Sequence, residues 1–313
     1  MVLREARDMK PGTMYSRRVL REQGMHPRVL ASEAITSPLP GLCCRADAPA
    51  PLRDVAFALQ TVVVPGSVIS DETAAELLGL PLPRRLTRRE GAALHCRMGR
   101  GGARRTQASL IVHQRRPAPT IQFGGLTISA PVTVLQEIAP KLSRMELVAC
   151  VDALAADRHG ASIRVPLQQI RADARSSRGR GARAVRRAAN EARERVWSPM
   201  ETRTRLLICA RGYPEPAPNV SVRDGATGSL FYIDLAYDQW RIAIEYDSEH
   251  HREDRRTWQR DLHKNEVLHD LGWKVLRISV ADFQRPADFF ARLDAAIRAR
   301  MPASGQARDA SRG

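Results

Sequence analysis

The sequence predicts an α/β (α+β) fold that is divided into several domains. The chain has 313 residues, of which 43% are hydrophobic, and this is enough for two domains and a small third, each with its own core. Helical and strand-like patterns alternate along most of its length. Its last third shows the order helix, strand, strand, strand, helix, strand, which is typical of one sheet covered by helices.

Residues 1–50 have the pattern of a reduced winged helix-turn-helix. We expect two short helices between Tyr15 and Ala34, separated by Gly24, with Pro27 in the opening turn of the second helix. Residues 35–44, which contain two prolines and a glycine, are expected to form a short wing. The arginines of the two helices are candidate phosphate contacts: Arg17, Arg18, Arg21 and Arg28.

Residues 51–170 predict a mixed α/β domain. Helices are expected at 55–59, 71–78, 132–139 and 143–155, and short strands at 109–112 and 126–128. Ser143 and Glu146 form a Ser-x-x-Glu capping box at the start of the last of these helices. A basic, glycine-rich run that begins at Arg97 is expected to form a mobile loop. It is not a phosphate-binding P-loop, because its glycines lack the required spacing. No catalytic constellation is recognisable in this domain.

Residues 171–197 form a basic connection that contains nine arginines and only three acidic residues. Most such runs are solvated surface, but this density of arginine next to an acidic hairpin favours contact with a phosphate backbone. The candidate contacts in this segment are Arg178, Arg180, Arg183, Arg186 and Arg187.

Residues 198–300 predict a third domain, organised around an acidic hairpin. Its first helix is expected to begin after Ser198, the N-cap, with Pro199 at the first helical position and Glu201 three residues after the cap. Strict alternation in the hairpin turns Phe231, Ile233 and Leu235 to one face together with Ile242, Ile244 and Tyr246, and it turns Asp234, Glu245 and Asp247 to the other. A long helix over 255–271, a strand over 273–279 and a helix over 287–300 follow, and residues 301–313 are expected to be disordered.

The hairpin carboxylates predict a cation site. The turn lies between Gln239 and Trp240, so Asp234 falls opposite Glu245, at a distance of about 4.5–5.5 Å between Cβ atoms. Like charges in that arrangement destabilise a sheet, and a hard divalent cation with oxygen ligands would neutralise them. An ordinary solvated hairpin with arginine partners is the alternative interpretation.

Charge and composition restrict the class of partner. A formal net charge of +16 indicates a polyanionic partner, most simply nucleic acid. No segment has the length and apolarity of a membrane span or a signal peptide. We therefore expect a cytoplasmic protein. The five cysteines are scattered and form no Cys/His metal spacing, so we interpret them as reduced thiols without a structural zinc.

Two parts of the sequence resemble known families. The segments Ser70–Pro81, Gly125–Pro131 and Val151–Leu154 are similar to the AbiEi-like proteins, whose namesake is the antitoxin of a type IV toxin–antitoxin system. This resemblance covers residues 15–154 and implies a winged helix followed by an α/β domain, with a cognate toxin or another defence-system protein as a possible partner.

The C-terminal domain resembles the very-short-patch-repair-like endonucleases of the PD-(D/E)xK superfamily. The resemblance covers residues 198–299, and its motifs are Ser198–Glu201, Ile233–Leu235, Ile244–Asp247, His250–His251 and Gly272–Arg277. It implies a restriction-endonuclease-like αβββαβ core in which Asp234 and Glu245 are metal ligands and Glu201 is the acidic residue of the first helix. Glu201 or Asp247 is a candidate further ligand, and a helix cap is the alternative role of Glu201. Two positions depart from the superfamily pattern, because Asp247 replaces its lysine and Ser248 replaces a glycine.

The residues and the resemblance together predict phosphodiester hydrolysis that depends on Mg²⁺ or Mn²⁺. His250 or His251 is a candidate general base, and Asp247 is a further candidate catalytic group. Arg260 and Lys264 lie one turn apart on the long helix, where Lys264 is positioned to replace the missing lysine and Arg260 to contact DNA.

The leading interpretation is a DNA-binding endonuclease. The alternative is a DNA-binding regulator or antitoxin whose nuclease-like domain has lost activity, and the two departures favour it. Retention of three hairpin acids opposes it. Action on RNA and the oligomeric state are left open, since no feature that reads a 2′-hydroxyl and no dimer helix is evident.

Overall fold

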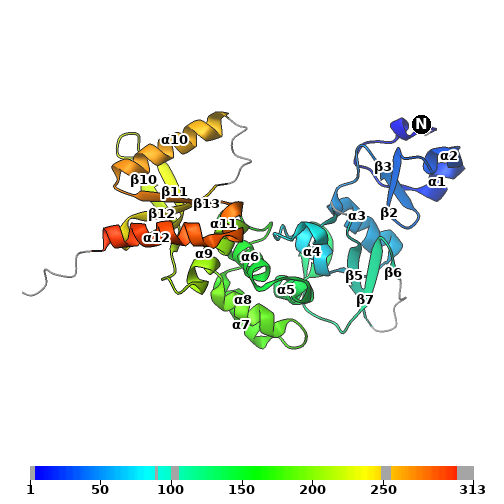
Figure 1. The fold of residues 1–313 in the computed structure, drawn as a ribbon. Coiled ribbons are helices and arrows are strands. Elements are labelled where there is room, and N and C mark those ends of the chain that lie inside the picture. Colours follow the sequence, from blue (N-terminus) through cyan, green and yellow to red (C-terminus); the bar gives the residue numbers. More distant parts are fainter. Residues whose placement is uncertain (1–3, 89–90, 100–105, 248–254, 302–313) are drawn as a thin grey trace, which may run out of the picture. The chain divides into compact units, whose positions relative to one another are not determined.

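The computed structural model describes residues 4–88, 91–99, 106–247 and 255–301 (Figure 1). The candidate general bases His250 and His251 lie outside these residues, as does Ser248. Of the C-terminal tail, 301–313, only Met301 is described. The chain divides into two compact units. We call Met1–Ala155 with Gly160–Ala192 the N-terminal unit, and Ala156–His159 with Arg193–Gly313 the C-terminal unit.

The α/β fold class is confirmed, since helices and strands alternate in both units. The elements of the N-terminal unit are η1 (Ala6–Asp8), β1 (Tyr15–Ser16), α1 (Arg17–Glu22), α2 (Pro27–Leu30), β2 (Ile35–Leu39), β3 (Leu42–Arg45), α3 (Leu52–Ala58), η2 (Leu59–Val63), β4 (Val68–Ile69), α4 (Asp71–Leu77), η3 (Arg84–Leu86), β5 (Leu94–Met98), β6 (Thr106–Gln107), β7 (Leu110–Gln114), β8 (Thr120–Phe123), β9 (Leu126–Ser129), α5 (Pro131–Ile138), η5 (Ala139–Lys141), α6 (Arg144–Ala155), α7 (Leu167–Ser176) and α8 (Ala182–Glu191).

The elements of the C-terminal unit are α9 (Pro199–Ala210), β10 (Ala217–Arg223), β11 (Leu230–Tyr237), η6 (Asp238–Trp240), β12 (Ile242–Tyr246), α10 (Arg255–Asp270), β13 (Lys274–Ile278), α11 (Val280–Gln284) and α12 (Pro286–Arg300).

The first 50 residues contain the two predicted short helices and the predicted hairpin. Gly24, at a φ of 95°, separates α1 from α2, and β2 and β3 pair antiparallel around Gly41. A third strand, β1, pairs with β3 to complete a sheet of order β1-β3-β2. Leu20, Leu30 and Cys43 are buried in one cluster beneath the helices, so the apolar positions of the two helices account for their packing.

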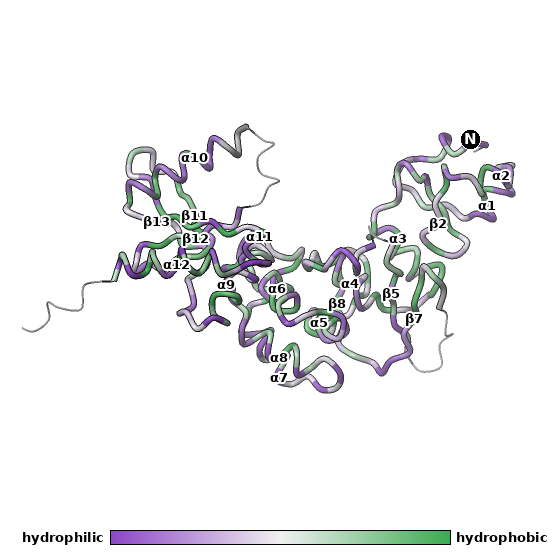
Figure 2. The backbone as a smooth tube through the Cα atoms, in the orientation of Figure 1, coloured by the Kyte–Doolittle hydropathy of each residue, from purple (hydrophilic) through white to green (hydrophobic). Residues whose placement is uncertain are grey.

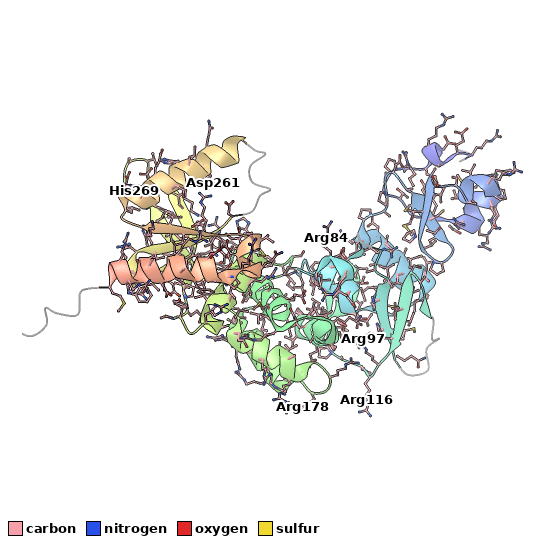
Figure 3. All side chains as sticks on the ribbon, in the orientation of Figure 1. Arg84, Arg97, Arg116, Arg178, Asp261 and His269 are labelled. Carbon is pink, nitrogen blue, oxygen red and sulfur yellow. The ribbon has the colours of Figure 1, made fainter. Side chains whose placement is uncertain are left out.

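The rest of the N-terminal unit is built on a six-stranded sheet of order β6-β7-β5-β4-β9-β8. Helix α4 contacts β5 and β9, and α5 packs against α4. The predicted capping box is present, because Ser143 N donates to Glu146 Oε2 at 2.7 Å and Glu146 N donates to Ser143 Oγ at 3.3 Å. The predicted mobile loop at Arg97 is wrong for that residue, which is buried in β5 (Figure 3). Arg97 there donates to Ser129 Oγ at 3.0 Å, a partner that the local sequence does not reveal.

Residues 171–197, which were predicted to be a connection between domains, are largely helical. They fall within α7 and α8 or follow them, and α8 packs against α5, α6 and α7. Val185, Ala188 and Ala189 supply its buried face, so small apolar residues between the arginines explain why this segment folds.

The C-terminal unit has the predicted αβββαβ order. Its sheet runs β10-β11-β12-β13, with antiparallel pairs except for the parallel pair β12–β13. One face packs on α9 and α12 through a cluster that includes Ile208, Leu235 and Phe289. The other face packs on α10 through Val267 and Leu268. Figure 2 shows β11 and β12 as mainly hydrophobic and α10 as mixed, in keeping with central strands and a half-exposed helix.

No helix in the described part of the chain is both long and apolar enough to cross a membrane. The five cysteines are free thiols, four of them buried, as the scattered spacing predicts.

Candidate active site

The β11–β12 hairpin brings two carboxylates together. Leu235 pairs with Ile244 and Ala236 with Ala243, and the same register continued by one residue sets Asp234 opposite Glu245, as predicted. Asp234 N donates to Glu245 Oε1 at 3.4 Å, and Tyr246 N donates to Asp234 Oδ2 at 3.0 Å. Each carboxylate is therefore held by the main chain of the opposite strand.

The predicted alternation along β11 is wrong at one point. Phe231 and Ile233 belong to the cluster on the α10 face together with Ala236, whereas Leu235 belongs to the cluster on the opposite face. The switch lies across from Asn219 of β10, whose φ is 47°. An asparagine in this left-handed conformation disturbs the pleat of the neighbouring strand, and a pattern of hydrophobic residues alone does not show it.

Helix α10 supplies the cation of the site. Lys264 Nζ lies 2.5 Å from Glu245 Oε2, and both side chains are 17% exposed. Leu268 and Val267, one turn further along the helix, anchor α10 to the sheet and so set the position of Lys264. Arg260, one turn before it, is exposed and lies outside the cavity lining described next.

A cavity of about 200 Å³ opens between the hairpin, α10 and β13. Its lining residues are Asp234, Glu245, Tyr246, Asp247, Asp261, Lys264, Asn265 and Arg277. Asp261 projects from α10 (Figure 3). On the parallel pair β12–β13, Glu245 is in register with Arg277, whose Nη1 lies 3.7 Å from Asp247 Oδ2.

The site holds more negative charge than its own cations neutralise. Burial, followed by the neighbouring Asp234 carboxylate, raises the pKa of Glu245 to about 7, although Lys264 acts in the opposite direction. Burial and the same Asp234 raise the pKa of Glu201 to about 7. A buried carboxylate whose pKa is raised by a neighbouring carboxylate is the environment that a divalent cation relieves.

Glu201 stands at the start of α9 and does not line the cavity. Ser198 caps the helix by accepting from Glu201 N at 3.2 Å. Glu201 Oε2 accepts from Trp197 N at 2.9 Å and from Asn219 Nδ2 at 2.6 Å. These bonds give Glu201 a structural role in joining α9 to β10, and its assignment as a metal ligand stays a prediction.

Sequence reasoning missed Asn219. Its amide nitrogen bonds both Glu201 and the Arg195 carbonyl, at 2.6 and 2.7 Å, and the residue is buried. The available signal was an asparagine inside an apolar strand, which indicates a left-handed position. His263 of α10 was also missed. It pairs with Asp224 at 3.1 Å and does not line the cavity.

The predicted DNA contacts of the first domain differ in exposure. Arg18, Arg21 and Arg28 are exposed on α1 and α2. Arg17 instead points inward and donates to the Leu30 carbonyl at 2.7 Å, which ties the two helices together.

The arginines of the connection also fall into two groups. Arg178 donates to the carbonyls of residues 175–177 at the end of α7 (Figure 3), and Arg186 donates to the Ser177 carbonyl at 3.0 Å. Arg180, Arg183 and Arg187 are exposed and line a pocket of about 470 Å³ at the beginning of α8. The guanidinium groups of Arg178 and Arg186 are thus partly engaged by main-chain carbonyls, whereas Arg180, Arg183 and Arg187 line a pocket that is open to solvent.

Comparison with known proteins supports the C-terminal assignment. Residues 210–297 match the model of REase_MTES_1575, a restriction-endonuclease-like family. Two proteins of Mycobacterium tuberculosis, the uncharacterized proteins MT2308 and Rv2248, are each 31% identical over 200 residues, which cover 63% of this chain and 72% of theirs. The crystal structure of the Rv2827c protein from the same species aligns with a TM-score of 0.35 and 16% identity over 70% of this chain and 85% of that chain.

Proposed function

Because the chain belongs to the family of MT2308 and Rv2248 and carries a restriction-endonuclease-like domain, we propose that it is a metal-dependent endonuclease that hydrolyses phosphodiester bonds in DNA. The observation that carries the proposal is the meeting of Asp234, Glu245 and Lys264 in one solvent-connected cavity. An acid pair with a lysine beside it can hold a metal ion and stabilise the charge that develops in phosphodiester hydrolysis.

The donor chemistry fits a hard divalent ion. Asp234 and Glu245 offer carboxylate oxygens, the ligands that Mg²⁺ and Mn²⁺ prefer, and the raised pKa of Glu245 reflects charge that burial leaves poorly compensated. When bound, such an ion would lower the pKa of a coordinated water and neutralise charge on the scissile phosphate. Restriction-endonuclease-like domains generally use divalent metals.

The protein residues have separate tasks in this proposal. Lys264 holds Glu245 in its orientation and places a positive charge beside the position of the phosphate. Asp247 and Arg277 form the far wall of the cavity, where the guanidinium is available to a phosphate oxygen. His251 and Glu201 stay predicted members of the site. In hydrolysis, a water oxygen bonds to phosphorus as one P–O ester bond breaks, and the water proton passes to a basic group of the site.

DNA binding is proposed for the basic surfaces of both units. Arg18, Arg21 and Arg28, on the predicted AbiEi-like winged helix, are exposed on α1 and α2. Arg180, Arg183 and Arg187 at α8 and Arg260 on α10 are also exposed. Together with the net charge of +16, these groups support a phosphate backbone as the partner.

A second candidate is a catalytically inactive DNA-binding regulator of the antitoxin type, which would act with a cognate toxin. The observation that favours it is the Lys264–Glu245 contact itself, because an internal ammonium already neutralises one of the two acids. Asp247, at the position of the superfamily lysine, is likewise within 3.7 Å of Arg277.

The two candidates are separated by cleavage of supercoiled plasmid and of mismatched or branched duplexes with Mg²⁺, with Mn²⁺ and with EDTA. Asp234→Asn keeps an oxygen acceptor for Tyr246 N and removes the charged ligand, so we expect folded, DNA-binding protein with cleavage reduced by about 10³-fold or more. Asp238→Asn is the matched control, because Asp238 lies in the same hairpin at 71% exposure.

Cleavage by wild type and control but not by Asp234→Asn supports the endonuclease. Equal cleavage by Asp234→Asn rejects the assignment of the site. A folded protein that binds DNA and cleaves none of these substrates leaves the regulator as the function.

A further inference from the structure

A second cluster of metal-ligating side chains lies in the N-terminal unit, far along the sequence from the hairpin acids. Asp71 follows β4, His95 lies on β5 and His113 lies on β7. These three strands are neighbours in the order β7-β5-β4, and β5 and β7 run parallel with Arg97 in register with His113. The sheet therefore brings together residues that are 18 to 42 positions apart in the chain.

The ligand atoms are already close to a coordination geometry. His95 Nδ1 lies 2.9 Å from His113 Nε2, and His113 Nε2 lies 3.5 Å from Asp71 Oδ2. All three ligand atoms lie within 4.8 Å of one another, and in the described part of the chain this is the one group of three that does so. Zinc bonds of about 2.0–2.1 Å in a tetrahedron separate neighbouring ligand atoms by about 3.3 Å, close to two of these distances.

A second carboxylate lies beside His95. The other ring nitrogen of His95, Nε2, lies 3.6 Å from Glu72 Oε2, a buried oxygen that has no hydrogen bond within the described part of the chain. Lys141 contacts the second oxygen of Glu72. A carboxylate that faces the far nitrogen of a histidine selects the tautomer whose near nitrogen is free to bind metal.

The backbone also holds Asp71 in an unfavourable conformation. Its φ is 52°, although it is neither glycine nor exposed, and such strain persists where the surrounding structure imposes it. Arg115 contacts both oxygens of Asp71, at 2.9 and 3.0 Å, and Glu137 accepts from Asp71 N at 3.0 Å.

We propose that Asp71, His95 and His113 bind a divalent transition metal, with Zn²⁺ as the best match to one carboxylate and two imidazoles. A water molecule would complete the coordination, since Glu72 faces the far nitrogen of His95. This site is separate from the proposed nuclease centre, whose oxygen ligands suit Mg²⁺, and it does not rest on the nuclease proposal.

Arg115 is the competitor of the metal. Its guanidinium neutralises Asp71 in the metal-free protein, and it lies 3.4 Å from His113 Nδ1. Because its side chain is 36% exposed, it is able to turn toward solvent as the ion enters. Removing this charge should strengthen metal binding, whereas in a purely structural ion-pair network the same change would only weaken the fold.

The test uses the full chain with Asp234→Asn in the background, so that the proposed nuclease site does not contribute. Zn²⁺ binding is measured by calorimetry, and Co²⁺ binding by its visible absorption. We expect one equivalent of metal, an affinity at least 100-fold lower in His113→Ala, 10- to 100-fold lower in Glu72→Gln, and higher in Arg115→Gln. His269→Ala, which removes an 89% exposed histidine of the C-terminal unit, should leave the affinity unchanged.

Circular dichroism melting of each variant distinguishes lost binding from lost folding. Absence of a stoichiometric site in the folded parent would overturn the proposal. So would equal binding by the parent and by folded His113→Ala, or binding that His269→Ala weakens as much as His113→Ala does.

Discussion

Replacement of Lys264 by methionine tests the electrostatics of the hairpin site most directly. The change removes the ammonium 2.5 Å from Glu245 and keeps much of the aliphatic stem that packs along α10. Glu245 then faces Asp234 in a cavity without its nearest cation. The assay is urea unfolding with EDTA present, followed by tryptophan fluorescence, because all four tryptophans lie in the C-terminal unit: Trp197, Trp240, Trp258 and Trp273.

The expected loss follows from the distance and the burial. At an effective dielectric constant of about 20, two unit charges 2.5 Å apart attract by about 7 kcal/mol before desolvation is counted. The desolvation of the ammonium, several kcal/mol, is also removed by the substitution. We therefore expect the free energy of unfolding at pH 8 to fall by about 2–4 kcal/mol.

The loss should depend on pH in a defined direction. The folded-state pKa of Glu245 is raised from its ordinary 4.5 to about 7, so this group lowers stability increasingly as the pH rises through that window. Without Lys264 the pKa of Glu245 rises further, so Glu245 of the folded variant stays protonated at pH 6. The deficit at pH 6 should be about 1–2 kcal/mol smaller than at pH 8.

Mn²⁺ should restore more stability to the variant than to the wild type, because the ion takes over the neutralisation of Glu245. Lys274→Met, at an exposed position of β13, is the control and should have little effect. A Lys264→Met protein that is as stable as the wild type at both pH values would refute this account of the site.

Three further predictions follow from the same contacts. Metal binding at the hairpin must displace a proton where the pKa of Glu245 is about 7, so the stabilisation by Mn²⁺ should increase from pH 6 to pH 8; a flat profile would contradict the raised pKa. Replacing Arg180, Arg183 and Arg187 by glutamine should reduce the slope of log DNA affinity against log salt by up to about 2.7. Replacing Arg178 and Arg186 should change this slope little, because their side chains donate to main-chain carbonyls. Asn219→Ala removes the amide that donates to Glu201 and to the Arg195 carbonyl, and it places alanine at a φ of 47°, so urea unfolding should show a loss of about 2–4 kcal/mol. Asn219→Gly should recover the part of this loss that is due to backbone strain.

Most of the local structure and one of the two candidate sites could be predicted from the sequence. Helix caps and breakers are short-range signals, which is why the capping box at Ser143, the cap at Ser198 and the end of α10 at Gly272 were predictable. The pairing of Asp234 with Glu245 was predictable for the same reason, since a short turn fixes the register of the strands that it joins.

Features that depend on contacts between distant segments could not be predicted from the sequence. The Lys264–Glu245 contact needs α10 to pack on the sheet, and the inward turn of Arg17 needs α2 beside α1. The cluster of Asp71, His95 and His113 shows the limit most clearly, because its residues share no motif and meet only through the order of β4, β5 and β7. Spacing along a chain predicts neighbours on one helix or one hairpin, whereas strand order is set by the packing of the whole sheet.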